Sequence, residues 1–137
     1  MKDKPTSSGP AADPQRIVDE LAAGWACLSL AADVERLVDL YSSDAIFFGS
    51  LPRMFFGHAG IVEYFQTISL ALLKSVRFDW QQAMFITPSV INAGGLVYFG
   101  MEIEGKPTNW RFGISWVLFN TAAGWKISAH HASPREL

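Results

Sequence analysis

The sequence predicts an α+β domain in which three helical segments are followed by long antiparallel strands. Over most of the chain up to residue 74, apolar residues recur at intervals of three and four, which is typical of helices with one buried face. After residue 74, apolar and polar residues alternate, and turns containing glycine separate the alternating runs. We expect residues 1–13 to form a disordered tail, rich in proline, serine, glycine and alanine, and residues 14–137 to form one domain.

The first helix is predicted to begin at Asp13–Pro14 and to run to about residue 31. An aspartate caps the end of a helix well, and a proline fits the first helical position. Helically spaced apolar residues then define one buried face: Ile17, Leu21, Trp25 and Leu28. A second, shorter helix is predicted after Asp33, and its apolar face consists of Val34, Leu37, Val38 and Tyr41.

A β-prone run at 45–49 follows a polar turn and predicts a short strand. Residues 51–60 contain one proline and two glycines, so we expect a loop. The Met-Phe-Phe run at 54–56 within that loop is too apolar to face water, and we expect it to pack against another surface. The third helix is predicted to begin at Gly60, and its apolar face consists of Ile61, Phe65, Ile68 and Leu72.

Everything after Lys74 has the pattern of a sheet. Alternation in the first strand shifts near Gln82, which indicates a β-bulge. Three short segments are predicted to be turns between the strands: 92–95 (NAGG), 104–107 (EGKP) and 121–124 (TAAG). The last strand then runs through the paired histidines His130 and His131.

Both faces of the predicted sheet carry apolar side chains, because successive residues of a strand point to opposite faces. One row of the strand at 110–119 is bulky and suits contact with the helices: Trp110, Phe112, Ile114, Trp116 and Leu118. The opposite row still contains Val117 and Phe119. Because the helices can cover only one face, we expect a homodimer through the outer sheet face.

Composition argues against several classes of partner. The chain has 11 basic and 13 acidic residues, a net charge of −2 and no basic run, so we expect no nucleic-acid partner. It contains no run of about 20 apolar residues, and therefore we expect no membrane partner. The N-terminus lacks the apolar core of a secretory signal, and the single cysteine cannot form an intrachain disulfide. Both observations fit a cytoplasmic protein. No phosphate-binding loop or nucleotide fingerprint is present, and we expect no cofactor.

Three segments, taken in order, resemble the nuclear transport factor 2-like superfamily: 40–45 (LYSSDA), 57–65 (GHAGIVEYF) and 125–133 (WKISAHHAS). Over roughly residues 14–134 the chain is similar to small bacterial SnoaL-like proteins and to the association domain of calcium/calmodulin-dependent kinases. The resemblance implies a cystatin-like roll, in which a strongly curved, mixed sheet wraps around the helices and leaves a pocket at the open end. It also implies dimers or larger rings.

The resemblance does not fix the chemistry, since members include isomerases, cyclases, hydrolases and binding domains. Ketosteroid-isomerase-like members place a general-base aspartate at the end of the first strand. The matching position here falls near Gly49, which has no side chain to accept a proton. Kinase association domains line their pocket with arginines, and the matching positions lie near Gly100, Trp116 and Ala132. The resemblance therefore implies a pocket that is more aromatic and less charged.

His130 and His131 must point to opposite faces of their strand, so they cannot share one metal ion, and we expect no metal site. In the register that the resemblance implies, His130 lies on the inner face with Ser128, where it could donate, accept or transfer a proton. His131 then lies with Trp125, Ile127 and Ala129 on the outer face, as a packed, hydrogen-bonded residue at the dimer interface.

Glu102 is the second candidate for acid–base chemistry, because a carboxylate beside apolar walls shifts towards its neutral form. The alternative is a solvated carboxylate at a strand end beside Gly105. Six aromatic residues are candidates to contact a ligand, although each could equally belong to the core: Trp25, Tyr41, Tyr64, Tyr98, Phe112 and Trp116.

Two hypotheses follow for the function. The first is a protein that binds a small, mostly apolar organic molecule without turnover. The second is an isomerase, cyclase or hydratase that uses His130 and Glu102 as acid and base. The second requires both side chains to reach one bound ligand, directly or through one water, which places them within about 6 Å of each other.

Overall fold

The computed structural model describes residues 13–136, so most of the predicted tail, residues 1–12, lies outside the described part. The structure contains three helices, one 3₁₀ turn and six strands, and the predicted order of helix, helix, strand, helix and long strands is found with the short strand β2 and the 3₁₀ turn added. Their bounds are α1 Pro14–Leu30, α2 Val34–Val38, β1 Tyr41–Phe48, β2 Phe55–Phe56, α3 Gly57–Thr67, the 3₁₀ turn Leu70–Leu72, β3 Leu73–Thr87, β4 Val90–Ile103, β5 Lys106–Thr121 and β6 Gly124–Arg135.

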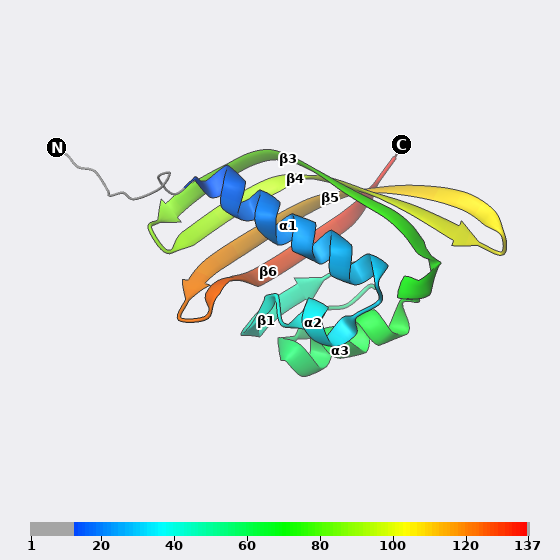
Figure 1. The fold of residues 1–137 in the computed structure, drawn as a ribbon, viewed down its shortest axis with the longest axis horizontal. Helices are drawn as coiled ribbons and strands as arrows, with labels where there is room; N and C mark the ends of the chain where they lie inside the picture. Colours follow the sequence, from blue (N-terminus) through cyan, green and yellow to red (C-terminus); the bar gives the residue numbers. More distant parts are fainter. Residues whose placement is uncertain (1–12, 137) are drawn as a thin grey trace.

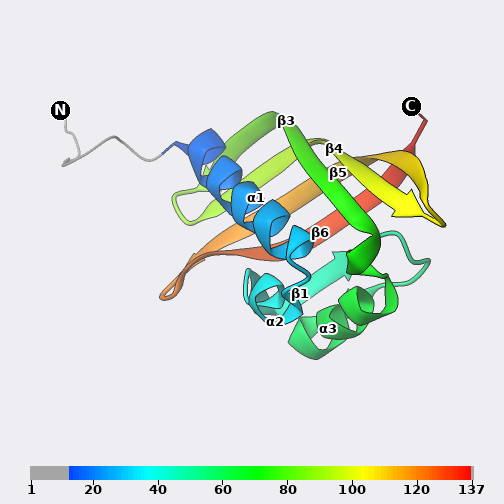
Figure 2. The same cartoon turned by 45° about the vertical axis from the view of Figure 1, so that its right-hand side comes forward.

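The six strands form one curved, mixed sheet in the order β2-β1-β6-β5-β4-β3. β1 runs parallel to β6, and all other neighbours are antiparallel. Helix α1 lies across one face of the long strands, while α2 and α3 lie beside β1 (Figure 1). The turned view in Figure 2 shows the same arrangement from another side. The predicted α+β fold class is confirmed.

Two aspartate caps set the starts of the first two helices, as predicted. The carboxylate of Asp13 accepts a hydrogen bond from the backbone N–H of Gln15 at 3.0 Å, and Pro14 occupies the first helical position. The carboxylate of Asp33 accepts one from the N–H of Arg36 at 3.2 Å. Each cap partners an N–H group that the helix itself leaves unpaired.

The second and third helices end earlier than the apolar spacing predicted, and the third begins three residues before the predicted Gly60. α2 ends at Val38 and Tyr41 already belongs to β1, because the carbonyl of Leu40 accepts the N–H of Ile127 from β6. Helix α3 begins at Gly57, where φ is +70°, and ends at Thr67. A backbone conformation of this kind suits glycine and turns the chain from strand to helix.

The predicted loop at 51–60 also contains a short strand. Phe55 and Phe56 form β2, which pairs with Phe47 and Ile46 of β1. Phe55 is fully buried and Phe56 is exposed, so only part of the apolar run packs inside the domain. Within the described residues the expected packing is found for Phe55, whereas Met54 and Phe56 are exposed.

The segment at 92–95 is not a turn, which corrects the prediction. β4 passes straight through it, and the turn that joins β3 to β4 lies at Pro88–Ser89. The β-bulge predicted near Gln82 is confirmed, because Trp80 pairs with Gly95 and Gln82 with Gly94, which leaves Gln81 unpaired. A Cβ at Gly95 would overlap the carbonyl oxygen of Asp79, so glycine is needed where the bulged strand crosses close to β4.

A second bulge, at Ser128, changes the predicted faces of β6. Ile127 pairs with Leu118 and Ala129 with Val117, so Ser128 has no partner in β5. Residues on either side of this bulge are therefore offset by one position. Ile127 is fully buried on the inner face, so placing it with His131 on the outer face was wrong.

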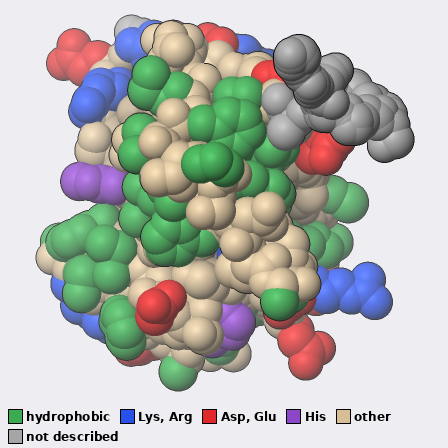
Figure 3. All heavy atoms as spheres, turned by 90° about the vertical axis from the view of Figure 1, so that its left-hand side faces the viewer, with side chains coloured by type: hydrophobic (Ala, Val, Ile, Leu, Met, Phe, Trp, Pro, Cys, Tyr) green, Lys and Arg blue, Asp and Glu red, His purple; other side chains and the backbone are tan. Residues whose placement is uncertain are grey.

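Four residues of the bulky row of β5 belong to the core with α1 and α3, as predicted: Phe112, Ile114, Trp116 and Leu118. Trp110, at the end of the row, is 42% exposed. Several large apolar side chains remain exposed elsewhere, among them Ile46, Phe48, Met84, Ile86 and Phe119. Figure 3 shows one side of the molecule, where hydrophobic side chains reach the surface in patches between polar groups. Within residues 13–136, no helix is long and apolar enough to cross a membrane.

The bulge in β3 leads us to expect different effects of substitution at two adjacent glycines of β4, Gly94 and Gly95. Gly95→Ala should lower the free energy of unfolding by about 1–3 kcal/mol, because the new methyl group collides with the backbone of β3. Gly94→Ala is the matched control, since its nearest neighbour would be the carbonyl oxygen of Ile114 at 3.9 Å, and it should change stability by less than about 0.5 kcal/mol. Urea denaturation of both variants measures the difference, and equal effects would contradict the bulge.

Candidate functional site

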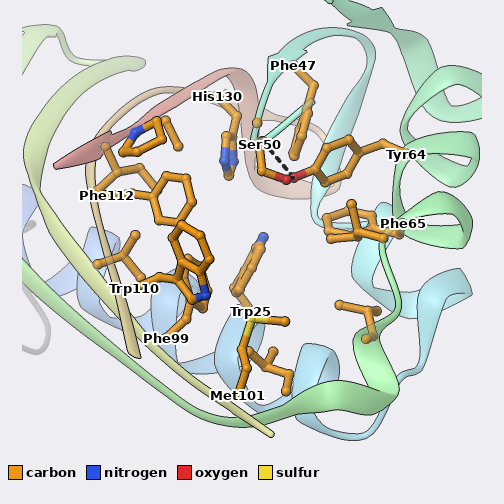
Figure 4. Close-up of a pocket in the computed structure, with 18 of the residues that line it drawn as sticks. Trp25, Phe47, Ser50, Tyr64, Phe65, Phe99, Met101, Trp110, Phe112 and His130 are labelled. Atoms are coloured by element: carbon orange, nitrogen blue, oxygen red, sulfur yellow. Dashed lines mark hydrogen bonds between the residues drawn. The ribbon is translucent and has the colours of Figure 1, made fainter. Parts of the chain in front are cut away.

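A cavity of about 420 Å³ lies between α1, α3 and the inner face of the sheet. Trp25 reaches it from α1, Tyr64 and Phe65 from α3, and Phe99 and Phe112 from β4 and β5 (Figure 4). Ile68, Leu70 and Leu73 line it beside the 3₁₀ turn, and Ile103, Trp110 and Pro134 line it from the ends of β4, β5 and β6. The curvature of the sheet thus leaves room for a small molecule.

The lining is almost entirely apolar and carries no lysine, arginine, aspartate or glutamate among the described residues. Polar groups reach the space from only a few places, chiefly His130 on β6 and the pair Tyr64 and Ser50. A cavity of this kind holds a ligand by shape and apolar contact, and its few polar groups fix the ligand's orientation.

His130 points inward and His131 points outward, as the alternation of β6 predicts. The side chain of His130 is 5% exposed and lines the cavity, whereas His131 is exposed beside Phe48. The imidazole of His130 stacks on the ring of Phe47, with centroids 4.2 Å apart and planes 24° apart. The two histidines therefore cannot act at one site.

A chain of buried hydrogen bonds holds the imidazole of His130. The indole N–H of Trp25 donates to the hydroxyl of Tyr41 at 2.9 Å, and that hydroxyl lies 2.9 Å from Nδ1 of His130. The indole N–H of Trp116 donates to the same Nδ1 at 3.0 Å. Because an indole nitrogen can only donate, Nδ1 must be the acceptor and cannot carry a proton. Tyr41 therefore donates to it as well.

The neutral imidazole must then carry its proton on Nε2. Nε2 makes no hydrogen bond to any described residue. It is also not one of the fully buried polar atoms without a partner, so part of its surface is accessible. It therefore borders the open space of the cavity, towards which the ring points in Figure 4. The site offers a ligand one N–H donor of fixed position.

Burial keeps this imidazole neutral at physiological pH. Desolvation, with a smaller contribution from the neighbouring His131, lowers the pKa of His130 from its ordinary value of 6.5 to about 3. With Nε2 protonated and Nδ1 occupied by two donors, the ring has no free lone pair to accept a proton from a ligand. This arrangement does not suit a general base.

Tyr64 fills the space beside Gly49, the position near which ketosteroid-isomerase-like proteins are expected to carry a general base. A Cβ at Gly49 would overlap the hydroxyl of Tyr64, so the phenol fills the volume of a side chain at position 49. The backbone N–H of Ser50 donates to this hydroxyl at 2.9 Å, and the Ser50 hydroxyl lies 2.9 Å from it. Burial raises the pKa of Tyr64, so the phenol remains protonated and neutral at physiological pH.

The structure divides the predicted site residues into three groups. His130, Trp25, Tyr64 and Phe112 line the cavity, while Tyr41 and Trp116 lie behind His130 as its hydrogen-bond donors. Tyr98 and Glu102 lie on the outer face of β4, which corrects their placement in the pocket.

The pairing of β4 with β5 explains this correction. Val97 pairs with Phe112 and Phe99 with Trp110, so the apolar row of β4 is the inner one. The ring of Tyr98 instead lies under the guanidinium of Arg77, which is 4.0 Å from its centroid. Glu102 is exposed near the β4–β5 turn and does not line the cavity, so His130 and Glu102 do not share a site.

Several lining residues were missed by the sequence analysis, notably Phe47, Phe65, Phe99 and Met101. A signal for two of them was present, since Phe99 and Met101 belong to the apolar row of β4. Phe47 carried no comparable signal, because both of its neighbours, Ile46 and Phe48, are also bulky and apolar. Only the structure shows that Phe47 is buried and that these two neighbours are exposed.

The low pKa of His130 predicts a loss of stability in mild acid. Below pH 6.5 the unfolded chain binds a proton at His130, whereas the folded protein does not until about pH 3. The free energy of unfolding should therefore fall as the pH falls through this window, by about 2 kcal/mol between pH 7.5 and 5. Above pH 6.5 both states are neutral at this residue and it contributes no pH dependence.

His130→Gln is the control for this measurement, because its amide does not titrate. Denaturation curves of the wild type and of this variant should diverge as the pH falls, and parallel curves would contradict the assignment. NMR titration of the His130 ring in the wild type gives the same answer without a variant, since the ring should not titrate between pH 5 and 8.

Comparison with known proteins places the fold in a family. A family model described as a SnoaL-like domain matches residues 18–135. A protein assigned as a calcium/calmodulin-dependent protein kinase II association domain from Xanthomonas campestris superimposes with a TM-score of 0.82 at 18% identity, covering 98% of this chain and 97% of that one. A ketosteroid isomerase-like protein from Erwinia carotovora atroseptica gives 0.75 at 12% identity, covering 89% and 96% of the two chains.

An NTF2-like protein with a cystatin-like fold from Novosphingobium aromaticivorans gives a TM-score of 0.72 at 16% identity, covering 90% of this chain and 82% of that one. At such identities the structural likeness shows a shared fold alone. No curated protein sequence matches the chain. The family model covers most of the chain, and the chain therefore belongs to the SnoaL-like domain family.

Proposed function

We propose that this protein binds a small, mostly apolar organic molecule in the cavity between α1, α3 and the sheet. The observation that carries the proposal is a space of about 420 Å³ whose walls are apolar and free of charged side chains among the described residues. Cavities of about 300–1,000 Å³ with few polar groups are typical of small-molecule sites. Eight aromatic residues line this one: Trp25, Phe47, Tyr64, Phe65, Phe78, Phe99, Trp110 and Phe112.

The polar groups favour binding over acid–base turnover. The SnoaL-like fold includes both small-molecule binders and isomerases, so the fold alone does not distinguish them. His130 has no lone pair free for a ligand's proton, and Glu102 lies on the opposite face of the sheet. Gly49 has no side chain at the position where related isomerases carry a base, and Tyr64 fills the space. The pair of His130 and Glu102, on which the alternative of an isomerase, cyclase or hydratase depends, is therefore not assembled.

A neutral fluorescent probe, N-phenyl-1-naphthylamine, tests this proposal. The wild type should bind it with increased fluorescence, and Ala132→Phe should weaken binding at least about tenfold, because position 132 lines the cavity and the added ring fills part of it. Ala123→Phe is the matched control, since Ala123 is exposed in the turn between β5 and β6 and does not line the cavity. Equal binding by both variants would place the probe elsewhere and contradict the proposal.

We also propose that the protein is a homodimer through the outer face of the sheet. Ile46 and Phe48 are 45% and 40% exposed on this face of β1, and Phe119 is 42% exposed at the end of β5. Exposed apolar side chains on a sheet face are costly in water and are typical of an interface between copies.

Sedimentation velocity at micromolar concentration tests the dimer. The wild type should sediment as a dimer, and Phe48→Glu should shift it towards the monomer, because a carboxylate would be buried without a partner. Leu30→Glu is the control, since Leu30 is 43% exposed on α1, away from the outer sheet face. A monomeric wild type at all concentrations would refute this interface.

A further inference from the structure

We propose that His130 selects ligands that are uncharged and carry a hydrogen-bond acceptor, such as a carbonyl oxygen, placed against its Nε2–H. The inference rests on the proposed function, since it concerns what the cavity accepts. It assigns His130 a role in specificity through a fixed donor, in place of acid–base chemistry.

The first step is that the donor cannot turn away. Rotating the imidazole by half a turn would put the ring carbon Cδ2 in the place of Nδ1, leaving the hydroxyl of Tyr41 and the indole N–H of Trp116 as unpaired buried donors. A buried donor without a partner has lost its hydrogen bond to water with no replacement, so this rotated state is disfavoured. Stacking against Phe47 also limits tilting of the ring. The Nε2–H group is therefore held in one direction, towards the cavity.

The second step is that this donor needs a partner when the cavity is filled. A water molecule can accept from Nε2–H while the cavity is empty of ligand, but a bulky apolar ligand displaces such water. A pure hydrocarbon then leaves the N–H unpaired, whereas a ligand with a carbonyl oxygen replaces the lost hydrogen bond. The site therefore discriminates between two ligands of equal shape by one oxygen atom.

The third step excludes charged ligands. A carboxylate in the cavity would be desolvated without a cationic side chain among the lining residues, and an ammonium group would have no carboxylate. His130 does not supply a positive charge at neutral pH, because burial lowers its pKa to about 3. The ligand must keep its polar character in neutral groups.

A second polar contact lies on the other side of Phe47. The Tyr64 ring centroid is 4.4 Å from that of Phe47, whose opposite neighbour is His130. The hydroxyls of Tyr64 and Ser50 carry one proton each, and the hydrogen bond between the two hydroxyls uses one of these protons. This pair can donate to a ligand or accept from it, so it adapts to different groups, and the discrimination rests with His130.

Three naphthalenes of similar shape test the inference: 2-acetylnaphthalene, 2-ethylnaphthalene and 2-naphthoate. Dissociation constants are measured by quenching of tryptophan fluorescence for the wild type, His130→Leu and His130→Gln. The preference for the acetyl over the ethyl compound should fall about tenfold in His130→Leu relative to the wild type. His130→Gln should keep the preference, because its amide can accept from Tyr41 and Trp116 and still donate into the cavity. The naphthoate should bind at least about 100-fold more weakly than the acetyl compound.

Comparing ratios between variants cancels the different solubilities of the probes. An unchanged ratio in His130→Leu, with both neutral probes bound, would overturn the role of His130 and leave the proposed cavity intact. Tight binding of the naphthoate would overturn the exclusion of charge. Failure of both neutral probes to bind any variant would overturn the proposed function and this inference together.

A measurement on the wild type serves if the leucine variant does not fold. Nitrogen-15 NMR of the imidazole should show the proton on Nε2 and none on Nδ1 at pH 7. Adding 2-acetylnaphthalene should move the Nε2–H resonance in the direction of a stronger hydrogen bond, and 2-ethylnaphthalene should not. A proton found on Nδ1, or identical shifts with both compounds, would contradict the inference.

Discussion

The hydrogen bonds that converge on Nδ1 of His130 fix both the packing of the domain and the chemistry of its cavity. Trp25, Tyr41, His130 and Trp116 come from α1, β1, β6 and β5, so one buried network ties the central helix to three strands. Buried polar groups specify a single arrangement because every alternative leaves one of them unpaired. The need to pair every polar group of this network positions α1 over the sheet. It also determines that Nε2 of the imidazole, and not Nδ1, faces the cavity. Structure and recognition therefore have one cause.

Much of the fold follows from local chemistry that a single sequence displays. The caps at Asp13 and Asp33, the bulky row of β5 and the slip near Gln82 depend on neighbours along the chain, and each was found where predicted. The errors arose where contacts distant in sequence decide the outcome. The hydrogen bond from Ile127 of β6 to Leu40 ends the second helix and starts β1. Gly95, which the sequence analysis assigned to a turn, is instead needed because β3 passes close to β4 there. Neither partner is visible from the local pattern.

The site was predictable to a similar extent. Alternation showed that His130 and His131 lie on opposite faces and that Glu102 and Tyr98 share one face with each other. It did not show which of two faces looks inward, and for β4 the choice was wrong. The bulge at Ser128 adds a further uncertainty, because Ile127 and His130 both face inward at a spacing that regular alternation does not allow. The tautomer of His130 could not be inferred either, since it depends on two indoles and a phenol from three other elements.

The shared volume of Gly49 and Tyr64 constrains how this domain could change in evolution. An acidic residue at position 49 would collide with the phenol, while a smaller residue at 64 alone would leave a void and deprive Ser50 of its partner. Each substitution is harmful without the other, so the effect of one depends on whether the other has already occurred. Descendants of this sequence could acquire a carboxylate in that corner only by passing through a less stable ancestor. A Cβ at position 49 would also overlap the ring of Phe47, so such a change would require Phe47 to move as well as Tyr64.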